Sequence, residues 1–266
     1  MYTINKASKF IFILIICIAT QITVTYAQYN QTPTQITSEE RAIFAFFRAA
    51  GEAPDFNAWI ESKPEYEALP ANRKHNYFVN EMMRLGGGYG NFDAEEDVLK
   101  LHLNIVSKYT PEKEKEDGET EKPKISFRIL NSTESYTPTF DFSFGEDKIS
   151  MIINNLATFS MLSLDEIQSA ALKEKVPYEK DEFDSDLEIW VRVTRADFKN
   201  PIKHRDHKQW LMVGEIAQIK NIYNSSYGAE PILLWDYVAP WYEETLRIQN
   251  MPEEEKYPHP FDLFRK

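Results

Sequence analysis

Cysteine is almost absent from this sequence. Cys17 is the single cysteine among 266 residues, and it lies in a short apolar stretch near the N-terminus. The chain therefore cannot form an internal disulfide, and beyond this stretch it offers neither a cysteine nucleophile nor a thiolate metal site. Secreted eukaryotic domains of this size often carry disulfides, so their absence favours a bacterial periplasm or cell surface.

The sequence also lacks a hydrophobic run long enough to cross a membrane. Residues 10–19 are apolar, but a transmembrane helix needs about 20 such residues. Lys6 and Lys9 precede this run, and Thr25 and Ala27 supply small residues at positions −3 and −1 of a cleavage site. The pattern is typical of a secretory signal peptide over residues 1–27, with an uncleaved anchor as the alternative. We expect cleavage after Ala27, no integral membrane span afterwards, and a periplasmic or secreted protein.

Positive charge is in short supply. The chain has 30 Lys and Arg residues against 42 Asp and Glu residues, which gives a net charge of −12. Cleavage after Ala27 removes Lys6 and Lys9 and leaves −14. A negative charge of this size disfavours nucleic acids and anionic membrane surfaces as partners. A protein or another envelope component is the partner that we expect.

Common catalytic motifs are missing as well. The sequence contains no Gly-x-Ser-x-Gly and no Ser-x-x-Lys in a recognisable setting. Glycine is scarce, with nine residues, and four of them lie in the GGGYG stretch 86–90. A phosphate-binding glycine loop follows a strand and opens a helix, whereas this stretch follows a predicted helix. We therefore interpret residues 86–90 as a flexible connection between a helix and a strand.

The first half of the chain after residue 27 indicates helices. Residues 28–37 are polar and are expected to form a flexible lead-in. Ser38 and Asp55 are predicted N-caps of two helices, the first of which ends at Gly51. A third helix is predicted over residues 71–85. These three form a helical segment over residues 38–90.

The rest of the chain indicates strands. Apolar and polar residues alternate in several short stretches, and a hairpin is predicted from residues 209–223 and 231–237. The charged segment 110–123 contains nothing to bury and is predicted to be a loop. A helix is inserted at residues 163–173, and residues 251–266 form a tail rich in proline and aromatic residues. Further strands are predicted over residues 98–109, 124–130, 139–145, 149–153 and 187–194.

This order predicts an α+β fold. The helical segment 38–90 is followed by a mostly antiparallel β domain over residues 91–250, with one inserted helix. The strands are expected to form either a β-sandwich or a partly open barrel.

Metal-ligand chemistry is concentrated in one stretch. His204, Asp206 and His207 lie within four residues, and with a further ligand they can hold Zn²⁺ or another divalent ion. Basic residues on both sides, and Arg205 between them, oppose a cation. We therefore favour a solvated basic hairpin tip and expect no metal and no cofactor. Through Arg205, the same tip can instead contact an acidic partner or a phosphate group.

Two carboxylates are candidates for acid–base chemistry. Asp141 lies on a predicted phenylalanine-rich strand, and Glu215 lies in the apolar run of another. If their strands are neighbours, the two can pair for general acid–base work or glycoside hydrolysis. The alternative is a β-bulge at Gly214 and Glu215 that turns the carboxylate outward.

An aromatic cluster near the C-terminus offers a possible binding surface. Trp235, Trp241 and Tyr242 can line a groove for a sugar, peptide or lipid. The alternative is that these rings pack in the core.

These observations predict an exported bacterial binding or interaction module. One alternative is a hydrolase of an envelope polymer that uses Glu215 or Asp141, or a metal held by His204 and His207. Another is a structural envelope protein. Enzymatic activity is therefore left open, with a binding role preferred.

Overall fold

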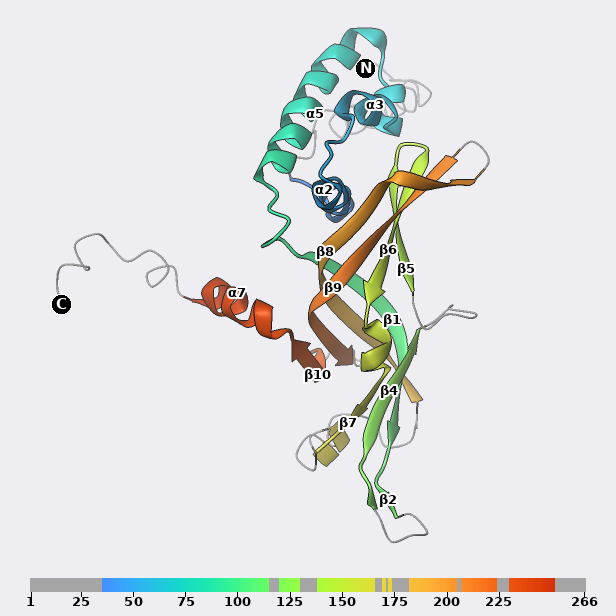
Figure 1. Ribbon diagram of the computed structural model, residues 1–266, viewed down its shortest axis with the longest axis vertical. Coiled ribbons are helices and arrows are strands. Elements are labelled where there is room, and N and C mark those ends of the chain that lie inside the picture. Colours follow the sequence, from blue (N-terminus) through green and yellow to red (C-terminus); the bar gives the residue numbers. More distant parts are fainter. Residues whose placement is uncertain are drawn as a thin grey trace, which may run out of the picture. The chain divides into compact units, whose positions relative to one another are not determined.

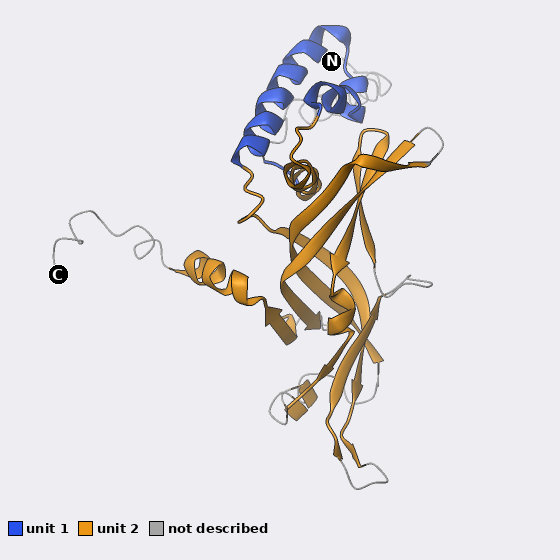
Figure 2. Cartoon of the chain, viewed as in Figure 1, with its two compact units in different colours: residues 1–37, 55–91 blue, residues 38–54, 92–266 orange. Residues whose placement is uncertain are grey.

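The computed structural model describes most of the chain after residue 34. The predicted signal peptide, the tail after residue 251, and Arg205 and Asp206 lie outside the described residues. The described residues are 35–114, 120–129, 138–165, 169–170, 172–173, 182–204, 207–223 and 230–251. They form two compact units (Figure 2). One contains residues 55–91 with the stretch just before residue 38, and the other contains residues 38–54 and everything from residue 92 onward.

The smaller unit is helical. It comprises α3 (Phe56–Glu61), α4 (Pro64–Glu67) and α5 (Ala71–Asn91). Asp55 caps α3 as predicted, since its carboxylate accepts a hydrogen bond of 3.1 Å from the backbone N–H of Ala58. Trp59 and Ile60 of α3 and Leu85 of α5 are buried.

Helix α5 continues through the glycine-rich stretch, so the predicted break at Gly86 is wrong. A glycine inside a helix costs only about 1 kcal/mol relative to alanine, and packing can offset that cost. Tyr89 lies in the last turns of α5 and packs edge-on against Phe56, with ring centroids 5.8 Å apart. This contact anchors the glycine-rich end of the helix.

The larger unit is built on a mixed β-sheet, which confirms the α+β fold. Its eight strands follow the order β5-β6-β9-β8-β1-β4-β7, with β10 paired to β9 beside β6. Among the described residues β5 and β7 do not pair with each other, so the sheet is not a closed barrel. The strands are β1 (Leu99–Thr110), β4 (Lys124–Ile129), β5 (Thr139–Phe144), β6 (Asp147–Asn154), β7 (Met161–Ser163), β8 (Glu182–His204), β9 (His207–Tyr223) and β10 (Ile232–Val238).

Several smaller elements complete this unit (Figure 1). The segment predicted to be a charged loop carries a two-stranded ladder of β2 (Lys113–Glu114) and β3 (Thr120–Glu121). A 3₁₀ turn, η1 (Leu156–Ser160), leads into β7, and α7 (Pro240–Asn250) follows β10. No helix in the described part of the chain is long and apolar enough to span a membrane.

Helix α2 (Ser38–Ala50) belongs to the sheet unit. Its Phe46 and Phe47 have almost no exposed surface. Their rings pack against Phe144 of β5, Phe198 of β8 and Trp210 of β9, with centroids 5.3–6.3 Å apart. The predicted end of this helix at Gly51 is confirmed by a φ of +70° at that residue. The aromatic stripe of α2 therefore covers one face of the sheet.

Strands β8 and β9 form a longer hairpin than predicted. The predicted strands 187–194 and 209–223 leave residues 195–208 as the connection between them. In the structure both strands continue into this connection until His204 pairs with His207. The pairing is irregular at three points: Ala217 is extra in β9, Thr194 is extra in β8, and residues 198–201 of β8 lie opposite Trp210 alone. The bulges at Ala217 and Thr194 lie on either side of Gly214 and Glu215, which are themselves in register with Val193 and Arg192.

The two faces of the sheet differ in character. The inner face carries buried apolar residues such as Leu187, Ile189 and Met212. The outer face carries the alternate residues, among them Glu188 and Arg192, which are partly exposed. This alternation is the period-two pattern of a strand with one buried face.

Strand β10 contacts the far side of the sheet through side chains. Phe127 of β4 stacks on Trp235 of β10 with centroids 6.5 Å apart, although β9, β8 and β1 lie between these strands in the sheet. Phe159 of η1 packs on Tyr237 of β10 at 4.8 Å. We call these two ring contacts the β10 junction. They show that the sheet is strongly curled around its inner face.

The surroundings of Gly87 and Gly214 predict opposite effects of substitution by alanine. No atom lies within 4 Å of a Cβ built on Gly87 in α5, whereas a Cβ on Gly214 in β9 would lie 2.2 Å from Cγ1 of Val191. We expect Gly87→Ala to stabilise α5 by about 0.5–1 kcal/mol and Gly214→Ala to destabilise the sheet by about 1–3 kcal/mol. Hydrogen exchange of peptides from each element measures both, and a stabilising Gly214→Ala would contradict the close approach of β8 and β9.

Candidate functional site

The predicted metal ligands are placed only in part. The β8–β9 register pairs His204 with His207. The side chain of His207 is exposed. Within the described ranges no group of three His, Cys, Asp or Glu residues is arranged to hold a metal ion. Because Asp206 lies outside those ranges, the metal site stays a sequence-based hypothesis.

Glu215 and Trp241, two of the predicted site residues, are brought together by Arg192. The Arg192 guanidinium donates a hydrogen bond of 3.1 Å to the Glu215 carboxylate. Its Cζ atom lies 3.7 Å from the centroid of the Trp241 ring. The arginine thus links the outer face of the sheet to α7. In this arrangement the Glu215 carboxylate is engaged in an ion pair.

Asp141 lies in a separate polar group on β5. Its carboxylate accepts a hydrogen bond of 2.6 Å from Ser150, whose hydroxyl accepts one of 2.7 Å from Gln209. The register places Asp141 opposite Ser150, and Ser150 opposite Leu211. Glu215 is therefore two strand spacings away and four residues further along, which corresponds to about 16 Å. This is a backbone distance, and it exceeds the separation of about 5–9.5 Å between paired glycosidase carboxyl groups. The two side chains also have different partners, Ser150 for Asp141 and Arg192 for Glu215.

The C-terminal aromatic residues are divided between the core and the surface. Trp235 and Tyr242 are buried, and burial raises the pKa of the Tyr242 hydroxyl. Tyr242 joins Ala217 and Ala239 in a small cluster where α7 meets the sheet, with Trp241 packed at its side. Of the three predicted ring side chains, only Trp241 retains partial exposure.

A second tryptophan lies on the outer face. The Lys100 and Lys220 ammonium groups lie 4.9 and 5.2 Å from the Trp190 ring centroid. Lys100 is also 2.6 Å from the Glu188 carboxylate. On this face Lys100, Lys220 and Glu188 are therefore engaged in contacts with residues of neighbouring strands.

A buried polar group on the inner face was missed by sequence reasoning. The Asn221 amide donates a hydrogen bond of 2.9 Å to the Ser107 hydroxyl, which lies 2.8 Å from the Ser185 hydroxyl. All three side chains are buried, and the Asn221 Oδ1 atom has no hydrogen-bond partner among the described residues. Such an oxygen costs about 1–3 kcal/mol. The available signal was that Ser107 and Asn221 occupy apolar-face positions of two predicted strands, whereas Ser185 lies outside the predicted strand 187–194.

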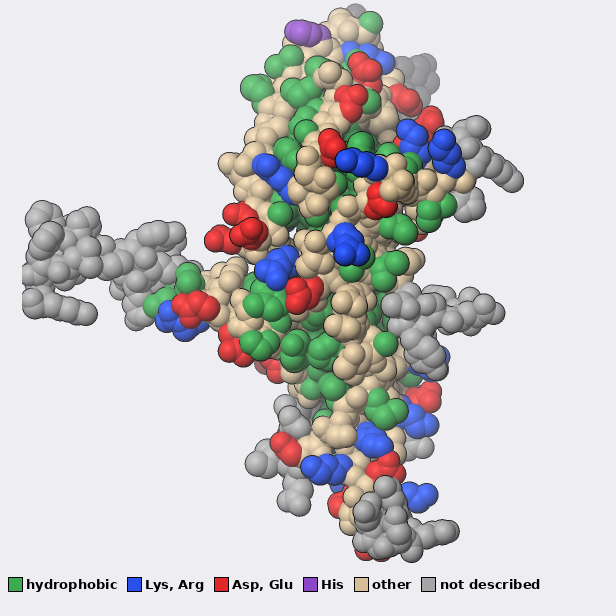
Figure 3. Space-filling view, viewed as in Figure 1, with side chains coloured by type: hydrophobic (Ala, Val, Ile, Leu, Met, Phe, Trp, Pro, Cys, Tyr) green, Lys and Arg blue, Asp and Glu red, His purple; other side chains and the backbone are tan. Residues whose placement is uncertain are grey.

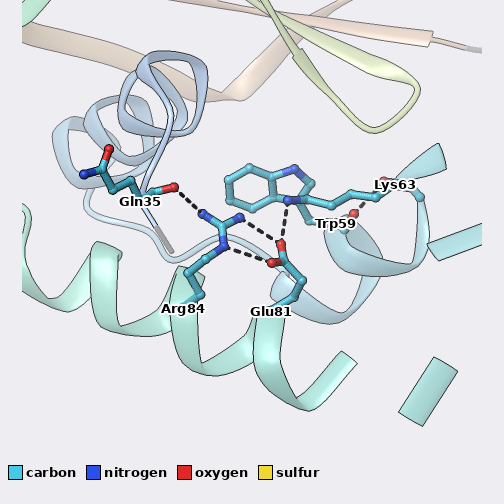
Figure 4. A network of polar contacts seen from close by, with 6 residues as sticks. Gln35, Trp59, Lys63, Glu81 and Arg84 are labelled. Atoms are coloured by element: carbon cyan, nitrogen blue, oxygen red, sulfur yellow. Dashed lines mark hydrogen bonds and ion pairs between the residues drawn. The ribbon is translucent and has the colours of Figure 1, made fainter. Parts of the chain in front are cut away.

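The smaller unit contains a buried charge. Figure 4 shows the Glu81 carboxylate between Arg84 and Lys63, at distances of 2.8–2.9 Å. Arg84 also donates a hydrogen bond of 3.1 Å to the carbonyl of Gln35. Burial alone raises the pKa of Glu81, but the hydrogen bonds and charges of Arg84 and Lys63 hold that pKa below the ordinary value of 4.5. The carboxylate is therefore ionised and holds α5 against the connection between α3 and α4, to which Lys63 belongs.

Comparison of the chain with protein-family models, curated proteins and solved structures finds no match.

The Glu81 cluster predicts a pH-dependent stability. Because the folded-state pKa is lowered, the stabilisation is present above the unfolded-state pKa and is lost as the pH falls through the folded-state value. We expect Glu81→Gln to cost about 3 kcal/mol at neutral pH, since it removes the negative charge that compensates Arg84 and Lys63 in a buried site, and to weaken the acid dependence. Urea denaturation between neutral and acid pH measures both. Glu67→Gln, at an exposed position, is the control, and an equal effect of the two variants would contradict the cluster's role.

Arg192 and Trp241 are expected to be energetically coupled. A double-mutant cycle with Arg192→Met and Trp241→Leu should give a coupling energy of about 1 kcal/mol, as expected for a partly desolvated cation–π contact. Arg192→Lys should recover little of it, because the ammonium lacks the planar group that stacks on the ring. The cycle is measured by urea denaturation. Additive single-variant effects would show that α7 does not depend on this contact.

Proposed function

We propose that the protein is an exported bacterial interaction module that binds another protein of the cell envelope at the β10 junction. The predicted signal peptide supports export. The sequence-based choice of a binding role over hydrolysis is supported by the outer-face carboxylates, because Glu188 and Glu215 are held in ion pairs and Asp141 lies far from Glu215.

One observation carries the proposal: the two strands next to the ring contacts, β10 and β7, carry large exposed apolar side chains. Leu233 and Tyr237 of β10 are 43% and 37% exposed, and Met161 of β7 is 58% exposed. Tyr237 touches Phe159 of η1, and η1 continues directly into β7. Exposed apolar groups that lie close together mark interaction sites more often than scattered ones do.

The space-filling view agrees with this position. Figure 3 shows hydrophobic side chains gathered on the visible face of the sheet unit, in the region where Figure 1 labels β10. Charged side chains are more frequent away from this region on the same face. We further propose that the five strands in the order β10, β9, β8, β1 and β4 form a partly open barrel. The β10 junction lies at the opening, where the described residues of β10 and β4 are not paired.

Photo-crosslinking in cells of the source organism tests the proposal. A photoreactive residue at Leu233, Tyr237 or Met161 should give an adduct with the same envelope protein, identified by mass spectrometry. Ile202 of β8, which is 46% exposed, is the matched control position and should not give that adduct. The chain recovered in the adduct should begin at Gln28 if the signal peptide is cleaved after Ala27. Equal crosslinking from Ile202, or a retained Met1, would contradict the corresponding part of the proposal.

A further inference from the structure

We infer that the partner binds as an extended strand that pairs with the edge of β10 opposite β9. This inference rests on the proposed function and specifies how the junction recognises its partner. The ligand class is a peptide segment with alternating apolar and polar residues, presented by another protein.

The backbone of β10 provides the first argument. Six of its seven residues pair with β9, and within the described ranges no other strand pairs with it. On its other side, the contacts with β4 and η1 are the two ring pairs of the junction. No backbone hydrogen bond from residues 232–238 to β4, β7 or η1 exists within the described chain. An edge of this kind presents a row of N–H and C=O groups that can pair with an added strand.

The side chains of β10 provide the second argument, because they distinguish a strand from a helix. Leu233 is opposite Ile222, and Trp235 is opposite Asn221, so the bulge at residue 234 places Leu233 on the other face from Trp235 and Tyr237. Leu233 is thus exposed on the outer face and Tyr237 on the inner face. An added strand alternates its side chains between both faces and covers both residues, whereas a helix laid on one face covers only one of them.

Charge indicates the composition of the segment. Glu230 and Asp236, just before and within β10, are exposed, and the protein as a whole is acidic. Like-charged partners are disfavoured at such an edge. We therefore expect lysine or arginine at the polar positions of the bound segment.

A displayed library of random peptides, selected on the mature full-length chain, tests this mode of binding. Synthetic copies of the selected peptides should slow hydrogen exchange of amides in residues 232–238. N-methylation of alternate amides along one edge of such a peptide should weaken binding more than about tenfold, because several backbone hydrogen bonds are lost. N-methylation along the opposite edge should have little effect.

Matched variants show where the peptides bind. Tyr237→Lys and Leu233→Lys change exposed positions and should each abolish binding, whereas Ile202→Lys should not. Strand addition would be overturned if the peptides protect other residues from exchange, or if N-methylation weakens binding on neither edge. It would also be overturned if the Tyr237→Lys and Leu233→Lys chains select the same peptides as the unchanged chain. If adducts nevertheless form at Leu233, Tyr237 and Met161 in cells, the proposed interaction role stands without it. If those adducts are also absent, both strand addition and the proposed interaction role are contradicted.

Discussion

Strand β9 is the element on which the sheet unit depends, because it bonds three different strands. Along one edge it pairs with β8, and along the other it pairs first with β6 and then with β10. The change of neighbour occurs between Glu215 and Gln218, where Ala217 forms a bulge and its carbonyl accepts a hydrogen bond of 2.8 Å from the backbone N–H of Ala239. A bulge increases the local twist of a strand. The curl that brings β4 near β10, and the start of α7, both follow from this short stretch.

The sequence predicted the individual strands better than their arrangement. Alternation along residues 98–109, 124–130 and 209–223 is strong, because one side of each strand is buried, and the hairpin of β9 with β10 is confirmed. The parallel pairing of β6 with β9 left no local signal, since it joins segments about 60 residues apart. The short turn η1 and strand β7 were missed for a similar reason. Their residues depend on contacts with β4 and β10 rather than on a pattern of their own.

The candidate residues show the same limit. Glu215 and Trp241 were found by their residue type and position, but Arg192, which joins them, was not. Nothing in the alternation of β8 distinguishes this arginine from its neighbours. Likewise, the glycine-rich stretch predicted a break that packing of Tyr89 on Phe56 overrides. Local preference decides such a position only where tertiary contacts are few.

The interior accommodates polar groups in two ways. In the smaller unit a charged carboxylate is neutralised by two cations, which is a fully satisfied arrangement. In the sheet unit the group formed by Asn221, Ser107 and Ser185 is uncharged, and one oxygen has no donor among the described residues. Buried polar groups specify how elements pair even when they add little stability. Asn221 and Ser107 therefore help to fix the register between β9 and β1 across β8.

The position of α2 in the chain has a consequence for synthesis. The helix precedes the smaller unit, yet its Phe46 and Phe47 pack on Phe198 and Trp210, which leave the ribosome about 150 residues later. Until then, two adjacent phenylalanine rings have no native surface to cover them. Contacts this distant in sequence make folding slow, and exposed apolar segments are bound by chaperones in the meantime. Helix α2 therefore cannot reach its native packing before Phe198 and Trp210 have been synthesised.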